Sequence, residues 1–178
     1  MKRISVICIL LAIVLIGTFL WMSSPKALEN TLDDYEKAVR DRAPDGLKLT
    51  IYYMDPTIMT RVPIQTLEDL KGFSQTKTIV VGAAQLAAHA DLIKQLDAAY
   101  LQPVEAPTWE ITSYLRLVYV FEQENGEPLL EVMATNLVHD ETILVNGFYV
   151  ENKPIFYELI DPFLTDEDRS VLARSFDD

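Results

Sequence analysis

Cysteine is almost missing from this sequence, which contains a single residue of that type, Cys8, among 178. Cys8 lies inside an uncharged stretch near the N-terminus, so the rest of the chain can form no disulfide within itself and has no thiol for catalysis. Small exported domains often rely on disulfides when their core is insufficient. This chain must fold by packing alone, which is more typical of a bacterial surface protein than of a eukaryotic secreted one.

Histidine and glycine are also scarce, with two and six residues respectively. His89 and His139 are too few for a zinc site, which usually takes three or four ligands dominated by His or Cys. The acidic segments 139–141 (HDE) and 165–168 (TDED) lack the regular spacing of a calcium loop. The sequence contains no G-x-G-x-x-G, G-K-[ST], H-E-x-x-H or G-x-S-x-G motif. We therefore expect no metal and no cofactor, and the catalytic residues of any enzyme remain unknown at this stage.

Basic residues are outnumbered, because Lys and Arg total 15 against 27 Asp and Glu, a formal net charge of −12. All 27 acidic residues and 13 of the 15 basic ones follow residue 22, so that part of the chain carries −14. Such a charge repels nucleic acid and anionic lipid headgroups, which excludes both as ligands. We interpret the acidity mainly as a source of solubility, with attraction to a cation or a basic partner as the alternative.

Residues 4–22 form a nineteen-residue run without a charge. As a helix it would cover about 28 Å, close to the hydrocarbon thickness of a bilayer. It lacks the polar face of a buried core helix, and Trp21 near its end suits a membrane interface. A cleaved signal peptide usually has a shorter apolar region and small residues at its cleavage site. We predict an uncleaved anchor, with a cleaved signal that releases a secreted domain as the alternative.

The predicted organisation is a cytoplasmic tail at residues 1–3, a transmembrane anchor at residues 4–22, a stalk at residues 23–27 and one extracytoplasmic α+β domain at residues 28–178. Basic residues before the run favour a cytoplasmic N-terminus, although four more follow the run within about twenty residues. The expected location is the cell membrane, with a single pass. The size of the final part is typical of one domain.

Periodicity predicts an α+β fold with a mixed, mostly antiparallel sheet packed by helices. Helices are expected over residues 28–42 and, in an Ala-rich stretch, over residues 84–100. Strands are expected at residues 47–55, 78–81 and 109–121, of which the second is short and buried.

Local signals predict two hairpins and two helix starts. Asn-Gly pairs at 125–126 and 146–147 are typical of tight β-hairpin turns. Thr66 with Asp69 predicts a capped helix that ends at Gly72. Thr165, followed by three acidic residues, predicts the start of a C-terminal helix, because negative charge stabilises a helix N-terminus.

Tyr52, Tyr114 and Arg116 form a candidate binding face, because they fall on the side of the predicted strands opposite the main apolar series. Exposed aromatic side chains there would bind a peptide or a glycan. The alternative, which we favour, is that a helix covers this face and makes the tyrosines part of the core.

We expect a non-enzymatic binding module at the bacterial cell surface. Its partners would be the lipid bilayer through residues 4–22 and a protein, peptide or cell-wall ligand. The alternative is a membrane-tethered hydrolase using paired carboxylates, drawn from Glu110, Glu122, Glu131 and Glu158. Acidic side chains converging in a deep cleft would favour the enzyme, and a convex surface with scattered carboxylates would favour the binder.

Overall fold

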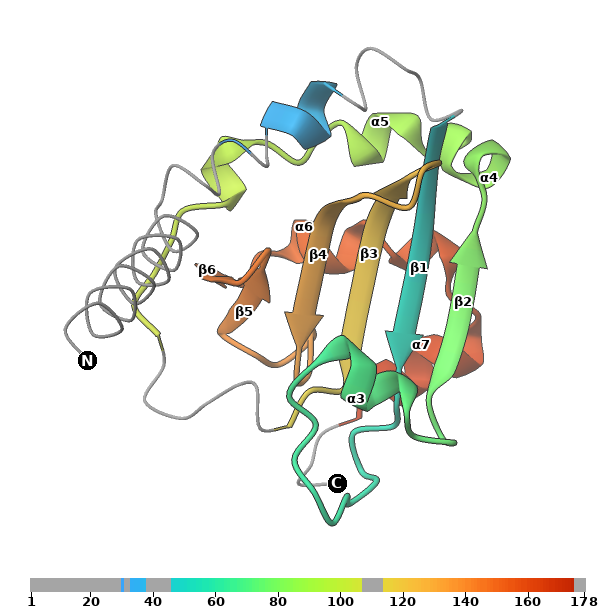
Figure 1. Ribbon diagram of the computed structural model, residues 1–178, viewed down its shortest axis with the longest axis vertical. Helices are drawn as coiled ribbons and strands as arrows, with labels where there is room; N and C mark the ends of the chain where they lie inside the picture. Colours follow the sequence, from blue (N-terminus) through green and yellow to red (C-terminus); the bar gives the residue numbers. More distant parts are fainter. Residues whose placement is uncertain (1–29, 31–32, 38–45, 107–113, 175–178) are drawn as a thin grey trace, which may run out of the picture.

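Six antiparallel strands form one sheet with helices on both of its faces (Figure 1). The computed structural model describes residues 30, 33–37, 46–106 and 114–174 of the chain. The strand order is β2-β1-β3-β4-β5-β6. The strands are β1 (Leu47–Tyr53), β2 (Lys77–Val81), β3 (Leu117–Gln123), β4 (Pro128–Ala134), β5 (Thr142–Val145) and β6 (Phe148–Glu151). The predicted α+β class is confirmed, but every pair of neighbouring strands is antiparallel, so the prediction of a mixed sheet is wrong.

The helices are short, and they differ in which part of the sheet they cover. Figure 1 shows α6 and α7 behind the sheet, α3 in front of it, and α4 and α5 near one end of the strands. Residues 33–37 are also helical, in agreement with part of the helix predicted over residues 28–42. The bounds are α3 (Leu67–Lys71), α4 (Ala83–Ala87), α5 (Ala90–Ile93), η2 (Ala98–Tyr100), α6 (Pro154–Glu158), η4 (Asp161–Phe163) and α7 (Asp166–Leu172).

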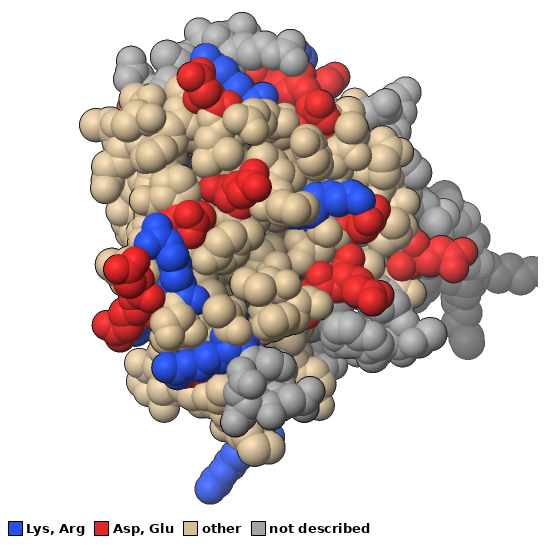
Figure 2. Space-filling view, turned by 180° about the vertical axis from the view of Figure 1, so that it is seen from behind, with Lys and Arg blue, Asp and Glu red and all other residues tan. Residues whose placement is uncertain are grey.

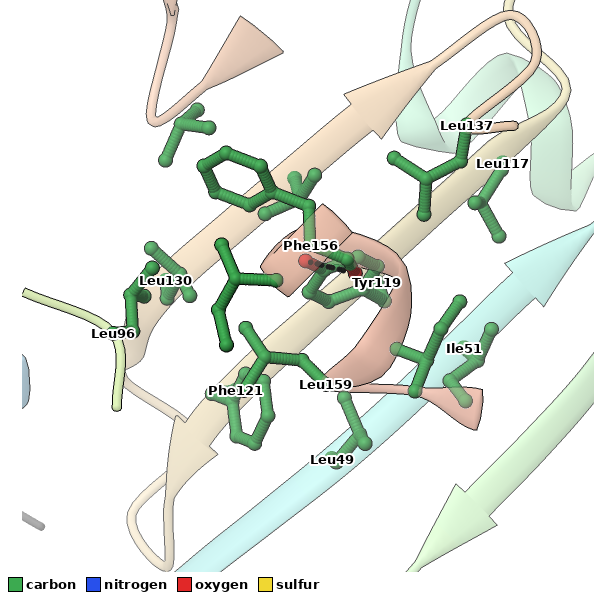
Figure 3. Packing of buried hydrophobic residues seen from close by; sticks show 14 of the residues in the cluster. Leu49, Ile51, Leu96, Leu117, Tyr119, Phe121, Leu130, Leu137, Phe156 and Leu159 are labelled. Carbon is green, nitrogen blue, oxygen red and sulfur yellow. Dashed lines mark hydrogen bonds between the residues drawn. The ribbon is translucent and has the colours of Figure 1, made fainter. Parts of the chain in front are cut away.

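The larger core lies between one face of the sheet and the C-terminal helices (Figure 3). Alternate residues of β1 and β3 point into it, and Ile51 lies opposite Tyr119 in the register of these strands. The Tyr119 hydroxyl is fully buried and donates a hydrogen bond of 3.0 Å to the carbonyl oxygen of Phe156 on α6. This bond satisfies two buried polar groups and fixes α6 over the centre of the sheet.

A smaller core covers the opposite face, beneath α3. Val118 and Val120 are buried there together with Leu70 of α3, so β3 is buried on both sides. Burial on both faces explains why β3 reads as a continuous apolar run, LVYVF, rather than as an alternating one. The remaining buried members of this cluster are Met54, Ile64 and Leu115.

The predicted hairpins and helix starts are present, and both helix starts are capping boxes. Asn146 and Gly147 both have positive φ, 49° and 81°, and they join the paired residues Val145 and Phe148 in a two-residue turn. Gly126, with φ of 83°, serves the β3–β4 hairpin. Reciprocal side-chain bonds between Thr66 and Asp69 cap α3, and the same arrangement of Thr165 and Asp168 caps α7.

Three further sequence predictions need correction. The Ala-rich helix over residues 84–100 is wrong, because α4 ends at Ala87 and the backbone of Asp97 is extended. The broken path lets three apolar side chains (Leu86, Ile93 and Leu96) reach one core, so tertiary packing overrides the helix propensity of alanine.

The other two corrections concern strands. β2 is an edge strand with a largely exposed face rather than a buried strand. The strand predicted over residues 109–121 begins only at Leu117 in the described part, and residues 107–113 lie outside that part.

The predicted cytoplasmic tail, anchor and stalk at residues 1–27 lie outside the described residues. Among the residues that the structure does describe, no helix has the length and apolarity needed to span a bilayer.

Replacing Gly147 with alanine should destabilise the fold by about 1–2 kcal/mol, because a Cβ strains a residue in the left-handed region. Gly46→Ala is the matched control, since a Cβ there would also meet open space but the φ of Gly46 is outside that region. Urea unfolding of both variants measures the difference. Equal stabilities would contradict this account of the turn.

Candidate functional site

The candidate binding residues lie at different depths. Tyr52 is half-buried and packs against the smaller core beneath α3, where the Lys71 Nζ lies 5.1 Å from the centre of its ring. A cation over an aromatic ring is a stabilising contact. Helix α3 therefore lies over part of Tyr52, whose side chain is half-buried rather than fully inside the core.

Arg116 is almost fully buried, with 2% of its surface exposed. Its Nη1 donates to the carbonyl of Leu115 at 3.0 Å and its Nη2 to that of Ile58 at 3.2 Å. Burial of the guanidinium lowers the pKa of Arg116. Arg116 thus links the segment 55–65 to the residue before β3 through its bond to Ile58. Its guanidinium group is buried and does not face a ligand at the surface.

Tyr114 is the exposed member of the three, with 57% of its surface accessible. It pairs with Ile64 through an isolated parallel bridge, so it lies beside the segment that connects β1 to α3. That segment carries two further exposed apolar side chains, Met59 at 94% and Val62 at 57% exposure. We call Met59, Val62 and Tyr114 the loop patch.

The sequence pointed to Tyr114 but missed Met59 and Val62. No periodic signal marks these two residues, because they lie in an irregular segment between two prolines, Pro56 and Pro63. Tertiary contacts such as the bridge between Ile64 and Tyr114 and the Arg116 bond to Ile58 show that this segment meets the residues just before β3.

The segment 55–65 has no regular structure, yet it is held at both ends. Asp55 accepts hydrogen bonds from the amide and the hydroxyl of Thr57, at 2.9 and 2.7 Å, and forms an ion pair with Arg174. Burial works against ionisation of Asp55, but these bonds outweigh it and lower the pKa of its carboxyl group. At the other end, the Leu115 amide donates to the Ile64 carbonyl at 3.0 Å.

A pocket of about 480 Å³ lies elsewhere, between the β4–β5 connection, the β6–α6 connection and the end of α7. Two carboxylates, Asp140 and Glu158, line it together with one cation, Lys153. The other lining residues are Leu137, Val138, Asn152, Pro154, Tyr157 and Ala173. Its volume is within the range of small-molecule sites.

Asp140 has a structural role at this pocket. Its Oδ2 accepts hydrogen bonds from the amides of Thr135 and Asn136, at 2.9 and 2.7 Å. The Asn152 side chain donates to the carbonyls of Asp140 and Leu137, both at 2.8 Å. Burial raises the pKa of Asp140 to about 6, despite the two amide donors and the nearby His139, which act in the opposite direction.

Carboxylates elsewhere on the described surface are dispersed. Figure 2 shows acidic groups on the helical side of the molecule interspersed with basic side chains and separated by uncharged surface. Arg169, for example, lies 2.7 Å from Asp161 and 2.9 Å from Asp166. Within the described ranges, no three His, Cys, Asp or Glu side chains are placed to hold a metal ion.

The two histidines contact different residues of the C-terminal region. The His89 ring packs edge-on against Phe163, with 5.2 Å between the ring centres. The His139 Nε2 lies 3.2 Å from the carbonyl oxygen of Ala173.

Comparisons with known proteins give no relative from which a role could be transferred. No protein-family model matches the chain, and no curated protein or solved structure matches it. The functional argument therefore depends on the geometry of the loop patch and of the pocket.

Removing the Asp140 carboxylate should change how stability depends on pH. The folded-state pKa is near 6 and the ordinary value is 3.8, so folding takes up a proton between these values. The contribution of the Asp140 carboxyl group to the free energy of unfolding is fully present below about pH 4 and is lost as the pH rises through about 6. The stability of the native chain relative to Asp140→Asn should therefore fall by at most about 3 kcal/mol between pH 4 and pH 7.

Denaturant unfolding at a series of pH values measures this change. Glu141→Gln, which removes the same charge from an exposed neighbour, is the matched control. A pH-independent difference between the native chain and Asp140→Asn would contradict the assignment.

Proposed function

We propose that this protein is a single-pass membrane protein whose extracytoplasmic domain binds a protein, peptide or cell-wall ligand at the cell surface without catalysis. The uncharged run at residues 4–22 supports the anchor, since its length suits a bilayer. The loop patch supports the binding role. The observation that carries the proposal is that Met59 and Val62 are exposed on a segment that the fold holds in place, beside the exposed Tyr114.

Exposed apolar side chains indicate an interaction site when they are grouped, whereas single ones are common on any protein surface. Tyrosine and methionine are enriched in protein interfaces, where they bury large areas. The loop patch combines both residue types, and the segment 55–65 that carries Met59 and Val62 lies at one end of the sheet (Figure 1). Arg61, which is exposed, lies between Met59 and Val62 in the sequence and adds a positive charge to this segment.

The second argument is preorganisation. A flexible loop loses conformational entropy when it binds, and a loop already fixed avoids that loss. The segment 55–65 is fixed by the Asp55–Arg174 ion pair, the Arg116 bond to Ile58 and the pairing of Ile64 with Tyr114. A buried arginine that fastens an irregular segment with exposed apolar side chains is consistent with a binding loop.

A membrane-tethered hydrolase remains the second candidate, because Asp140 and Glu158 line one pocket. The raised pKa of Asp140 would let it act as a general acid near neutral pH. Against this role, the Asp140 carboxylate already accepts hydrogen bonds from the amides of Thr135 and Asn136. These bonds make it a structural part of the β4–β5 connection.

Substitutions in the loop patch should weaken ligand binding. Met59→Ala with Tyr114→Ala should reduce recovery of a bound partner by the full-length chain from detergent-solubilised membranes by about tenfold or more, as for central interface residues. Val104→Ala is the matched control, because Val104 is also exposed but lies beside β6. Quantitative mass spectrometry of the captured proteins and peptidoglycan fragments measures recovery. Unchanged recovery with the double variant would remove the loop patch as the binding surface.

The anchor makes a separate prediction. Full-length protein expressed in bacteria should sediment with membranes and resist extraction by high salt, because burial of an apolar helix in lipid does not depend on charge. Amino-terminal sequencing of the mature chain provides the control. Release by salt, or a mature N-terminus between residues 24 and 28, would instead support the secreted alternative.

A further inference from the structure

The pocket beside α6 has walls from three parts of the chain, and hydrogen bonds fasten these walls to one another. The Asn152 side chain donates to the carbonyls of Leu137 and Asp140, both at 2.8 Å, which joins the β6–α6 connection to the β4–β5 connection. The Asn136 side chain donates to the Arg174 carbonyl at 2.6 Å, which joins the β4–β5 connection to the residue that follows the end of α7. The pocket is therefore largely preformed, as most small-molecule sites are.

Two carboxylates that line the pocket keep oxygens that can accept further hydrogen bonds. Asp140 accepts both backbone amides through Oδ2, and its Oδ1 accepts no bond from the described residues. Glu158 is exposed on α6, and its carboxylate likewise makes no hydrogen bond with the part of the chain that the structure describes. Both groups are thus available to a ligand that brings N–H or O–H donors.

The charge of the pocket favours a cation. Its lining contains two carboxylates and one ammonium group, that of Lys153. This ammonium forms an ion pair with Glu151, which lies outside the lining, so part of its charge is neutralised locally. The net charge of −12 on the chain also attracts cations and repels anions.

The rest of the lining suits an apolar body attached to that cation. Leu137, Val138, Pro154 and Ala173 supply aliphatic surface, and Tyr157 supplies an aromatic ring. Val138 is 45% exposed, so an aliphatic chain in the pocket would remove apolar surface from water. An ammonium group beside an aromatic ring gains further stabilisation.

We infer that this pocket binds a small molecule that carries a primary ammonium group on an aliphatic chain, with Asp140 and Glu158 accepting hydrogen bonds from the ammonium. A primary ammonium has three N–H donors and no acceptor, so it can bond to both carboxylates at once. The pocket volume of about 480 Å³ is enough for such a molecule. The site is separate from the loop patch, so the inference stands or falls independently of the proposed function.

Binding of an ammonium group should depend on the ionisation of Asp140. Burial raises the pKa of this carboxyl group to about 6, so about a tenth of it is ionised at pH 5 and about nine tenths at pH 7. Alkylammonium groups stay charged over this range. Affinity should therefore rise by up to about tenfold between pH 5 and pH 7. The other charged or titratable groups around Asp140 are its neighbours His139 and Glu141, then Lys153, Tyr157 and Glu158 of the pocket, Glu151 beside Lys153, and Arg174.

Titration of the full-length chain in a neutral detergent with n-butylamine tests the inference. Ligand-observed NMR at pH 7 should show saturable binding above that of protein-free micelles, whereas butanoate, of matched size and opposite charge, should not bind. Asp140→Asn should weaken butylamine binding about tenfold, because a hydrogen bond between two charged groups is lost. Glu158→Gln should weaken it about threefold, because this carboxylate is exposed. Glu141→Gln is the matched control and should bind as the native chain does, since Glu141 lies outside the lining.

The pH dependence separates Asp140 from its neighbour His139. Asp140→Asn retains His139 and should lose the rise in affinity between pH 5 and pH 7. Circular dichroism verifies the fold of each variant, and Glu158→Gln keeps the test decisive if Asp140→Asn does not fold. Absence of saturable butylamine binding, equal binding of butanoate, native affinity in Glu158→Gln, or an unchanged pH dependence in folded Asp140→Asn would overturn the inference.

Discussion

The contact between α6 and the centre of the sheet is the constraint on which the rest of the structure depends. Tyr119 of β3 donates its buried hydroxyl proton to the Phe156 carbonyl, and the apolar side chains around this bond join the C-terminal helices to strands from both halves of the chain. Because these side chains fill one face of the sheet, the C-terminal third of the sequence covers strands made by the first half. In the described part of the chain, neither half therefore has a complete core of its own.

Burial of β3 on both faces has a second consequence. The sheet face beneath α3 is apolar enough to hold Arg116 in an interior position, where it bonds to the Ile58 carbonyl rather than to water. A cation in that position costs desolvation free energy, which its hydrogen bonds to carbonyl groups offset. The connection from β1 to α3 is thus held in place by hydrogen bonds without forming a helix or a strand. Met59 and Val62 are exposed on this connection.

Many carboxylates of this acidic chain act as structural acceptors. Asp69 and Asp168 accept backbone amides at helix starts, Asp140 does so in the β4–β5 connection, and Asp55 accepts from Thr57 beside Arg174. Hydrogen bonds from Thr66 and Gln65 lower the pKa of Asp69, and the Tyr53 hydroxyl helps to lower that of Asp168 against the effect of burial. Asp140 differs, because burial outweighs its donors. These four carboxylates are thus part of the architecture.

The sequence by itself determined the local elements: both Asn-Gly hairpins, both helix starts and β1. These depend on interactions between residues close in the chain, so their signals are complete in the sequence. Tertiary structure alone decided that β2 lies at an edge, that the Ala-rich stretch is broken, that Tyr52 and Arg116 are covered while Tyr114 is exposed, and that Met59 and Val62 lie beside it. Each of these outcomes depends on which distant segment packs on which face, and alternation along a strand is the same whether its second face meets a helix or water.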